Sequence, residues 1–240
     1  MRLSSLLYAV LACLVTTTAT AARADPTASL VRIRAVAADG SLKLGSGVVI
    51  GPDRIATACH VTRRGSNIQV IHEAQRWTAT AQTGDVAHDV CVLSVAPERL
   101  DLPVVQLRDS SELREGERVT AASFQGGRRI ATISDGIVTA LYSYDGGDVI
   151  RTTAAFDFGS SGGALFDADG RLVGLLAFKA REENVRFAVP SEWITASAGT
   201  PVDFPLDPMR PQIAFWERSF FARPGFLTFG LLGAGAHDNR

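Results

Sequence analysis

Short runs rich in Val, Ile and Thr recur along this chain, and residues that favour turns separate them. Runs of this kind are typical of β-strands, and no long segment repeats its apolar residues with the period of a helix. The first set occupies positions 30–36, 42–50, 54–59, 67–72, 76–83 and 89–95. The pattern therefore predicts an all-β chain.

A second set of runs follows at positions 104–107, 117–124, 128–141, 148–154, 171–178 and 184–189. The intervening residues 96–116 are richer in charge and proline, which is typical of a connection between two halves. Two sets of equal size predict two six-stranded antiparallel β-barrels. We place them at about 28–100 and 103–190, within a domain that covers residues 25–199.

The two ends of the chain differ from this pattern. After the last run, Ser191 is a candidate N-cap for a short C-terminal helix. The tail, residues 200–240, is rich in proline and phenylalanine without clear periodicity, which predicts either a segment wrapped on the domain surface or partial disorder. Its apolar piece, 226–236, is too short to span a bilayer.

Residues 1–24 resemble a cleavable signal peptide. Arg2 precedes an apolar run at 3–15, and Ala22-Arg23-Ala24 is a small-x-small cleavage signal. The run is shorter than the roughly 20 residues that a spanning helix needs, so an uncleaved membrane anchor is the weaker alternative. Cleavage before Asp25 predicts a secreted or periplasmic protein.

Composition excludes several classes of protein. The 240 residues are 46% hydrophobic and 20% charged, with a formal net charge of −1. Loss of Arg2 and Arg23 with the leader leaves 22 basic against 25 acidic side chains, a net charge of −3. These values exclude a disordered protein, a coiled coil and a nucleic-acid binder that works through bulk charge.

The cysteine count leaves two readings open. Cys13 lies in the leader, and the mature chain keeps Cys59 and Cys91. An even pair in an exported protein favours a disulfide, because that compartment is oxidising. Two small buried apolar side chains are the alternative.

Three segments place a reactive side chain beside backbone features that catalysis requires. In the first, Gly45-Ser46-Gly47 is followed by Ala56-Thr57-Ala58-Cys59-His60-Val61. In the second, Asp89 opens an apolar strand, and in the third Ser161 lies between glycines in the sequence DFGSSGGAL. Together these motifs resemble the chymotrypsin/trypsin family of serine proteases, and more closely its bacterial HtrA-like branch. The resemblance covers roughly residues 30–198.

The resemblance implies that His60 is the general base, Asp89 its orienting partner and Ser161 the nucleophile. Imidazole accepts the serine proton near neutral pH, and a buried carboxylate fixes its tautomer. The amides of Gly159 and Ser161 would form the oxyanion hole, since glycines allow the backbone to turn there. This chemistry needs no cofactor and no metal.

Each role has a competitor in the sequence. Asp85 competes with Asp89, which is favoured because it directly precedes the apolar strand. Ser160 competes with Ser161, which is favoured by the two glycines after it. His72 and His88 are interpreted as surface or loop histidines, and His237 lies in the tail.

Two other functional classes are disfavoured. A zinc site from Cys59, His60, His88 and Cys91 fits no standard ligand spacing. The string Gly159-x-Ser161-x-Gly163 also matches the nucleophile elbow of α/β-hydrolases. That fold needs crossover helices and an acid and a histidine after the serine, whereas the only later histidine here is His237.

The substrate pocket is less readable. Ala155, six residues before the nucleophile, is neutral where trypsin-type pockets carry an acid, which argues against cleavage after Lys or Arg. Phe156, Phe158 and Phe178 predict an apolar pocket for aliphatic side chains. Since His60 and Asp89 must approach each other, Cys59 and Cys91 would lie on adjacent segments, which predicts a disulfide.

The expected function is an exported serine endopeptidase acting on protein or peptide substrates, with no nucleic-acid partner and no stable membrane span. The alternative is a binding or scaffold protein that keeps the fold with little or no turnover. Ser160 precedes the nucleophile in place of the aspartate used in activation by a new N-terminus, so we expect no such activation. The length leaves no room for the PDZ module of many HtrA-like relatives.

Overall fold

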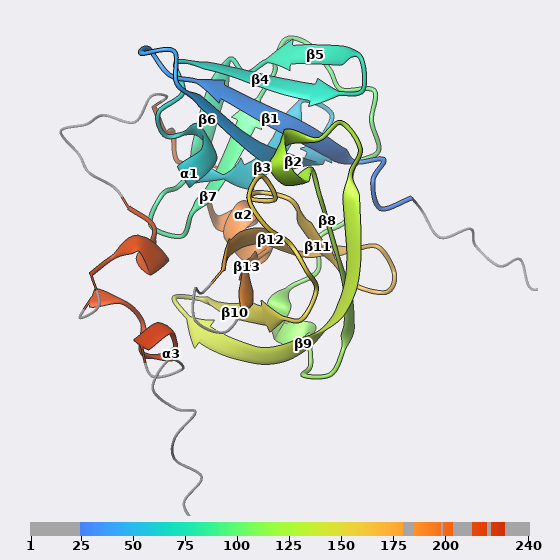
Figure 1. Cartoon of the computed structure of the whole chain (residues 1–240), viewed down its shortest axis with the longest axis vertical. Coiled ribbons are helices and arrows are strands. Elements are labelled where there is room, and N and C mark those ends of the chain that lie inside the picture. Colours follow the sequence, from blue (N-terminus) through green and yellow to red (C-terminus); the bar gives the residue numbers. More distant parts are fainter. Residues whose placement is uncertain (1–24, 180–184, 198, 204–212, 220–221, 229–240) are drawn as a thin grey trace, which may run out of the picture.

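The computed structural model describes residues 25–179, 185–197, 199–203, 213–219 and 222–228 (Figure 1). The expected leader at 1–24, with Cys13, lies outside the described residues, as does His237. Two β-structures lie one above the other in Figure 1, with residues 213–219 and 222–228 along the left side. The two-part β architecture predicted from the strand pattern is confirmed.

The first half is a seven-stranded antiparallel sheet. Its spatial order is β5 (Gln75–Thr78), β4 (Asn67–His72), β1 (Leu30–Val36), β2 (Leu42–Gly51), β3 (Arg54–Ala58), β7 (Val90–Ser94) and β6 (Ala81–Asp85). The strand expected at 76–83 is divided into β5 and β6, which pair with opposite ends of the sheet. Only Ala79 and Thr80 separate them, and their N–H groups donate to the carbonyls of Ile68 on β4 and Ser94 on β7. A single bent segment therefore closes the half-barrel, which explains seven strands in place of six.

The second half is a closed six-stranded barrel. It runs β10 (Gly147–Thr152), β13 (Arg186–Pro190), β12 (Leu172–Lys179), β11 (Ala164–Phe166), β8 (Arg118–Ser123) and β9 (Thr132–Tyr144). The strand count is as predicted, but one member differs. Residues 104–107 form no strand, and Leu107 makes only an isolated bridge to Leu172. The sixth strand is β11, directly after the Ser161 glycines.

Helices are few and short. α1 (Cys59–Thr62) follows β3, α2 (Glu192–Ser197) follows β13 as predicted after Ser191, and α3 (Gly225–Thr228) belongs to the tail. Short 3₁₀ turns occupy Ser110–Glu112, Gln125–Gly127 and Phe215–Glu217. No helix in the described part of the chain is long and apolar enough to cross a membrane.

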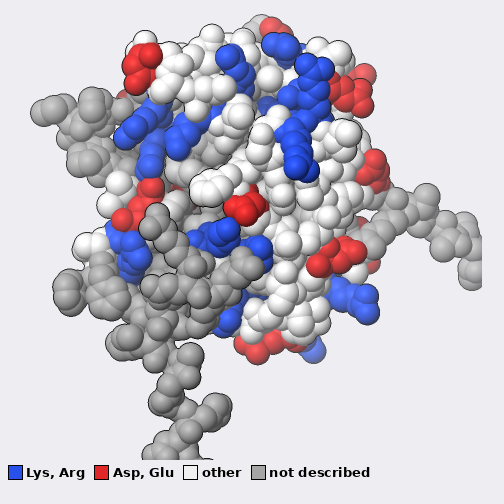
Figure 2. Space-filling view, viewed as in Figure 1, with Lys and Arg blue, Asp and Glu red and all other residues white. Residues whose placement is uncertain are grey.

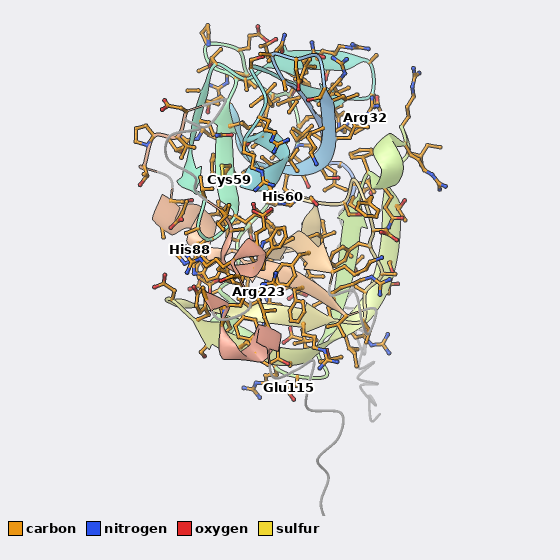
Figure 3. All side chains as sticks on the ribbon, turned by 60° about the vertical axis from the view of Figure 1, so that its left-hand side comes forward. Arg32, Cys59, His60, His88, Glu115 and Arg223 are labelled. Atoms are coloured by element: carbon orange, nitrogen blue, oxygen red, sulfur yellow. A yellow bond between two sulfur atoms is a disulfide. The ribbon has the colours of Figure 1, made fainter. Side chains whose placement is uncertain are left out.

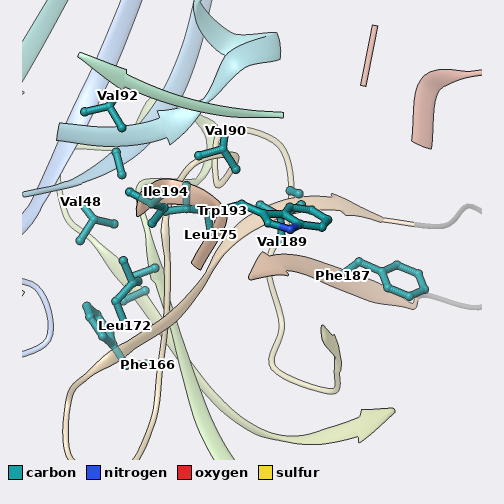
Figure 4. Close-up of a cluster of buried hydrophobic side chains, with 14 of the residues drawn as sticks. Val48, Val90, Val92, Phe166, Leu172, Leu175, Phe187, Val189, Trp193 and Ile194 are labelled. Atoms are coloured by element: carbon teal, nitrogen blue, oxygen red, sulfur yellow. The ribbon is translucent and has the colours of Figure 1, made fainter. Parts of the chain in front are cut away.

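Three apolar clusters form the core, one within each half and one between the halves. One fills the first sheet and another fills the closed barrel. The largest lies between them and joins first-sheet residues such as Val48 and Val92 to Leu172, Leu175 and Trp193 of the second half (Figure 4). Each large side chain buried in this way contributes about 1.5–3 kcal/mol. The two halves therefore pack as one body.

The tail is partly docked, in agreement with the first of the two expectations for it. Residues 200–202 run along β6, where Gly84 N–H donates to Thr200 and Val202 N–H donates to Gln82. Phe215 is fully buried in the cluster between the halves. The described part of the tail thus covers a sheet edge and contributes to the core.

Charge is distributed unevenly over the surface. Figure 2 shows basic side chains gathered over the upper part of the molecule, where the first sheet lies. Arg32, Arg34, Arg76 and Arg129 line a cavity of about 610 Å³ there. Burial and the charges of Arg129 and Arg76 lower the pKa of Arg32. The chain therefore carries a local cluster of positive side chains although its net charge is close to zero.

A disulfide joins Cys59 to Cys91, as expected, with the two Cα atoms 4.9 Å apart. Both cysteines are buried and pack against Val86 and Val202. Both sulfurs are bonded to each other, so neither is available as a ligand in the zinc alternative.

We predict that alkylation without reductant leaves Cys59 and Cys91 unmodified, and that reduction under denaturing conditions exposes both to the reagent. Replacing both with Ala is expected to lower the free energy of unfolding by about 2–4 kcal/mol, because the cross-link restricts the unfolded chain. Peptide mapping by mass spectrometry and urea denaturation measure the two effects. Free thiols at both positions in protein purified without reductant would contradict this pairing.

Candidate active site

His60 and Asp89 form the centre of the candidate site. His60 lies in α1, directly after β3, and Asp89 directly precedes β7, which pairs with β3. The strand pairing brings the two residues together where the halves meet, and Figure 3 shows His60 beside Cys59 at this junction. Asp89 is 1% exposed, whereas the His60 side chain is 17% exposed.

Two hydrogen bonds fix the imidazole. Nδ1 of His60 lies 2.6 Å from Oδ2 of Asp89, and the backbone N–H of His60 donates to Oδ1 over 2.8 Å. A carboxylate can only accept, so Nδ1 carries the proton and a neutral imidazole has its lone pair on Nε2. Asp89 itself has a φ of 62°, a left-handed conformation that Asp tolerates better than most residues. The ring is thus held ready to accept a proton at Nε2.

Asp85, the competing acid, makes its hydrogen bonds to residues other than His60. Oδ2 of Asp85 lies 2.8 Å from Nδ1 of His88, and Oδ1 accepts the backbone N–H groups of Ala87 and His88. The structure therefore pairs Asp89, and not Asp85, with His60.

The two candidate serines, Ser160 and Ser161, differ in burial and in hydrogen bonding. Ser160 is fully buried, and its Oγ accepts a hydrogen bond from Ser123. Ser161 is partly exposed, and its hydroxyl makes no hydrogen bond to any described residue. Ser161 is thus the serine whose hydroxyl is not already engaged in a bond within the described fold.

The peptide groups before Ser161 have a defined orientation. The carbonyl of Phe158 accepts from Gly126 N–H over 2.7 Å, and the carbonyl of Ser160 accepts from Gly163 N–H over 2.8 Å. In a trans peptide the N–H points opposite to the carbonyl, so the N–H groups of Gly159 and Ser161 face away from these partners. Neither donates to a described residue. Two donors are therefore available beside the Ser161 hydroxyl.

Ser46 holds this loop against the first sheet. Its N–H donates to the Ser161 carbonyl over 2.8 Å, and its Oγ donates to the Gly159 carbonyl over 2.9 Å. The same Oγ accepts from Phe124 N–H over 2.9 Å, and Ser46 is fully buried. Ser46 belongs to the first of the three sequence motifs, but the spacing of that motif did not predict this role for it.

Close packing requires glycine after the nucleophile. Gly162 has a φ of 79°, and a Cβ there would lie 2.4 Å from both the Ser46 carbonyl and Thr57 Oγ1. Any side chain would force the loop away from β2 and β3. The glycine thus allows Ser161 to approach the segment that leads into His60.

The four residues of the expected pocket lie in different environments. Phe156 is 4% exposed and packs in the core of the closed barrel, while Phe158 is 87% exposed. Ala155 is exposed, and Phe178 is half-buried on β12. The structure therefore does not bring the three phenylalanines together around one cavity.

His88 lies in the loop between β6 and β7, as expected, but its side chain is engaged on several sides. Its ring stacks on Trp193 with centroids 4.1 Å apart, and its nitrogens lie 2.8 Å from Asp85 and 2.9 Å from Asp145. Asp85 belongs to the first half and Asp145 to the hairpin between β9 and β10, so the imidazole bridges the halves. Burial disfavours its charged form, but the hydrogen bond and charge of Asp85 and the charge of Asp145 outweigh this and raise the pKa of His88. His88 correspondingly lowers the pKa of Asp85.

Comparison of the sequence with protein-family models identifies the family to which the chain belongs. The model of the trypsin-like peptidase domain matches residues 45–175, more than half of the chain, from β2 to β12. The chain belongs to the trypsin-like peptidase family. The resemblance to HtrA-like proteins expected from the three motifs agrees with this assignment.

Relatives of this trypsin-like peptidase domain are HtrA-type proteases. It is 34% identical over 165 residues to "Serine protease Do-like HtrA" of Bacillus subtilis (strain 168), covering 61% of this chain and 36% of the relative. It is 28% identical over 177 residues to "Periplasmic serine endoprotease DegP" of Escherichia coli (strain K12), covering 68% and 36%. The chain thus spans about a third of the length of these curated relatives.

Solved structures extend the likeness to the fold. The "HtrA-type protease AlgW with tripeptide" superposes with a TM-score of 0.62 at 27% identity, covering 71% of this chain and 58% of that one. The active form of the Rv3671c protease from M. tuberculosis has a TM-score of 0.66 at 23% identity, covering 86% and 99%, and supports the fold alone. The peptidase fold is therefore shown by both sequence and structure.

We predict that Ser46→Ala lowers both stability and turnover in this trypsin-like peptidase domain. The Gly159 carbonyl and the Phe124 N–H would lose their partner, and an unpaired buried group costs about 1–3 kcal/mol. Urea denaturation and peptidase assays measure the two losses. Ser66→Ala is the matched control, because its hydroxyl bonds to the Val36 carbonyl at an exposed position. Equal effects of both substitutions would contradict the role of Ser46.

We predict that the free energy of unfolding decreases as pH rises through the raised pKa of His88. A raised pKa in the folded state adds stability that is complete below the unfolded value of about 6.5 and disappears above the folded one. Urea denaturation between about pH 5.5 and 8.5 measures this loss. His88→Gln is expected to flatten that part of the profile, and His72→Gln, which leaves the Asp85 and Asp145 contacts intact, is not. A steep profile retained in His88→Gln would assign the effect to another group.

Proposed function

We propose that this chain is an exported serine endopeptidase that cleaves protein or peptide substrates through an acyl-enzyme. The proposal rests on two observations: the His60 imidazole is fixed on the Asp89 carboxylate, and Ser46 ties the Ser161 loop to β2 of the first sheet. A histidine oriented by a buried acid next to an available serine is the arrangement that nucleophilic catalysis requires. The names of the relatives, which are serine proteases, support the same activity.

Each residue has a distinct role in this mechanism. Ser161 Oγ attacks the substrate carbonyl carbon while Nε2 of His60 takes its proton. The negative oxygen that forms accepts hydrogen bonds from the Gly159 and Ser161 N–H groups. His60 then gives the proton to the leaving amine, and water repeats the sequence to release the acyl group. Asp89 stabilises the imidazolium in both steps.

Export is part of the proposal. The leader-like residues 1–24 and the disulfide both suit an oxidising compartment outside the cytoplasm. Three relatives carry "periplasmic" in their names.

A fluorophosphonate probe tests the nucleophile directly. We expect covalent labelling at Ser161, located by peptide mapping, because Ser161 displaces fluoride from phosphorus as His60 accepts its proton. Ser161→Ala and His60→Ala should abolish labelling and lower kcat on the order of 10⁵–10⁶-fold. Asp89→Asn should lower kcat roughly 10⁴-fold, since the imidazole loses its orienting carboxylate.

The alternative is a binding protein that keeps the peptidase fold without turnover. A folded protein that neither labels with the probe nor cleaves an unfolded protein substrate would support that alternative and sink the proposal. Thermal unfolding of each variant is the control for folding. Labelling at Ser160 in place of Ser161 would also overturn the assignment.

A further inference from the structure

Two anchors fix part of the C-terminal tail beside the candidate active site. The fully buried Phe215 donates its N–H to the Ala87 carbonyl over 2.8 Å and packs its ring near Tyr144 and Trp193. Two residues later, Glu217 accepts a hydrogen bond of 2.6 Å from Arg63. These contacts span the junction of both halves. The residue between the anchors therefore has a defined position.

That residue is Trp216, and it contacts His60. The two rings meet edge to face, with centroids 5.4 Å apart and an interplanar angle of 89°. On another side the indole stacks on Phe178 of β12, with centroids 5.1 Å apart at 20°. Its Nε1 is buried and has no hydrogen-bond partner among the described residues, so aromatic packing holds the ring. The Trp216 indole thus lies between the His60 imidazole and Phe178 of β12 and contacts both rings.

The edge of β12 beside this space is open. β12 pairs with β13 along one side, and on the other it pairs with β11 and then, through Leu176, with Gly162 and Gly163. Beyond Leu176, no described strand pairs with that side at residues 177–179. An open strand edge accepts an extended peptide through backbone hydrogen bonds. A peptide added here would start at Ser161 and run past Phe178.

We propose that the tail segment 213–219 builds a wall of the substrate cleft, and that Trp216 restricts the substrate residue immediately before the one whose carbonyl Ser161 attacks. A peptide that runs from Ser161 along β12 places that side chain between His60 and Phe178, where the indole lies. Only small side chains such as Gly or Ala fit beside it. This inference rests on the proposed function, because it concerns substrate selection at the same site.

A peptide library randomised at that one position tests the proposal. With the full chain, we expect Gly and Ala to be favoured over Leu and Phe about tenfold to a hundredfold in kcat/KM. Trp216→Ala removes the wall, and the preference should fall by at least about tenfold, while Trp216→Phe should retain part of it. Mass spectrometry of the cleaved products reads the ratios.

Three controls separate the possible outcomes. Phe226→Ala removes another tail aromatic, which stacks on Tyr142 and has no ring contact with His60, and should leave the preference unchanged. Fluorophosphonate labelling at Ser161 is measured in Trp216→Ala and in the unsubstituted chain, and labelling in both shows that any change of preference arises in a protein whose nucleophile still reacts. Thermal unfolding checks that each variant folds, and Trp216→Leu replaces Trp216→Ala if the latter does not.

The results distinguish this inference from the proposed function. Labelling at Ser161 with a preference that Trp216→Ala leaves unchanged would overturn the inference alone. Cleavage that rises by one common factor for all peptides would also overturn it, since the segment would then block the cleft as a whole. Absence of both labelling and cleavage in the full chain would overturn the proposed function, and the inference with it.

Discussion

The attachment of the Ser161 loop to the first sheet is the constraint on which the site depends. Ser161 and its glycines belong to the second half of the chain, whereas His60 and Asp89 belong to the first. Ser46 connects them, because its N–H and its hydroxyl bind the two carbonyls that flank Ser160. The large core between the halves fixes their relative position, and Ser46 fixes the loop within that frame. The site is therefore a property of the junction, and neither half holds it alone.

The sequence predicted the regular part of the fold well, because Val- and Ile-rich runs between turns are a local signal. It was less informative where strand identity depends on distant partners. β11 has only three residues and follows two glycines, so its composition is that of a loop. Residues 104–107 look strand-like, but they lie beside a barrel that β11 has already closed. The bend between β5 and β6 arises because one segment must pair with both ends of its sheet.

In the candidate site, too, the sequence was informative for residues in local motifs and less informative for residues whose partners are distant in the chain. The motifs predicted that His60, Asp89 and Ser161 would come together, since each carries its own local pattern. Ser46 was inside a motif, but its bonds reach residues more than 70 positions away, which no spacing rule reveals. His88 was correctly predicted to lie in a loop, but its second partner, Asp145, is 57 residues distant, so nothing in the sequence indicated that His88 bridges the two halves. Trp216 gave no signal at all, since the tail has no period and its contacts form only after both halves are folded.

The closure of the sheets has a consequence for self-association. An unpaired strand edge can pair with strands of other chains, which is a route to aggregation. Here one barrel is closed, residues 200–202 cover β6, and the opposite end of the first sheet is the four-residue β5. Among the described residues, the open stretch of β12 at 177–179 lies next to Ser161. Within the described residues, closure and covering leave this stretch of β12 as an open edge beside the Ser161 loop, and they shorten the strand edges that the rest of the molecule offers for aggregation.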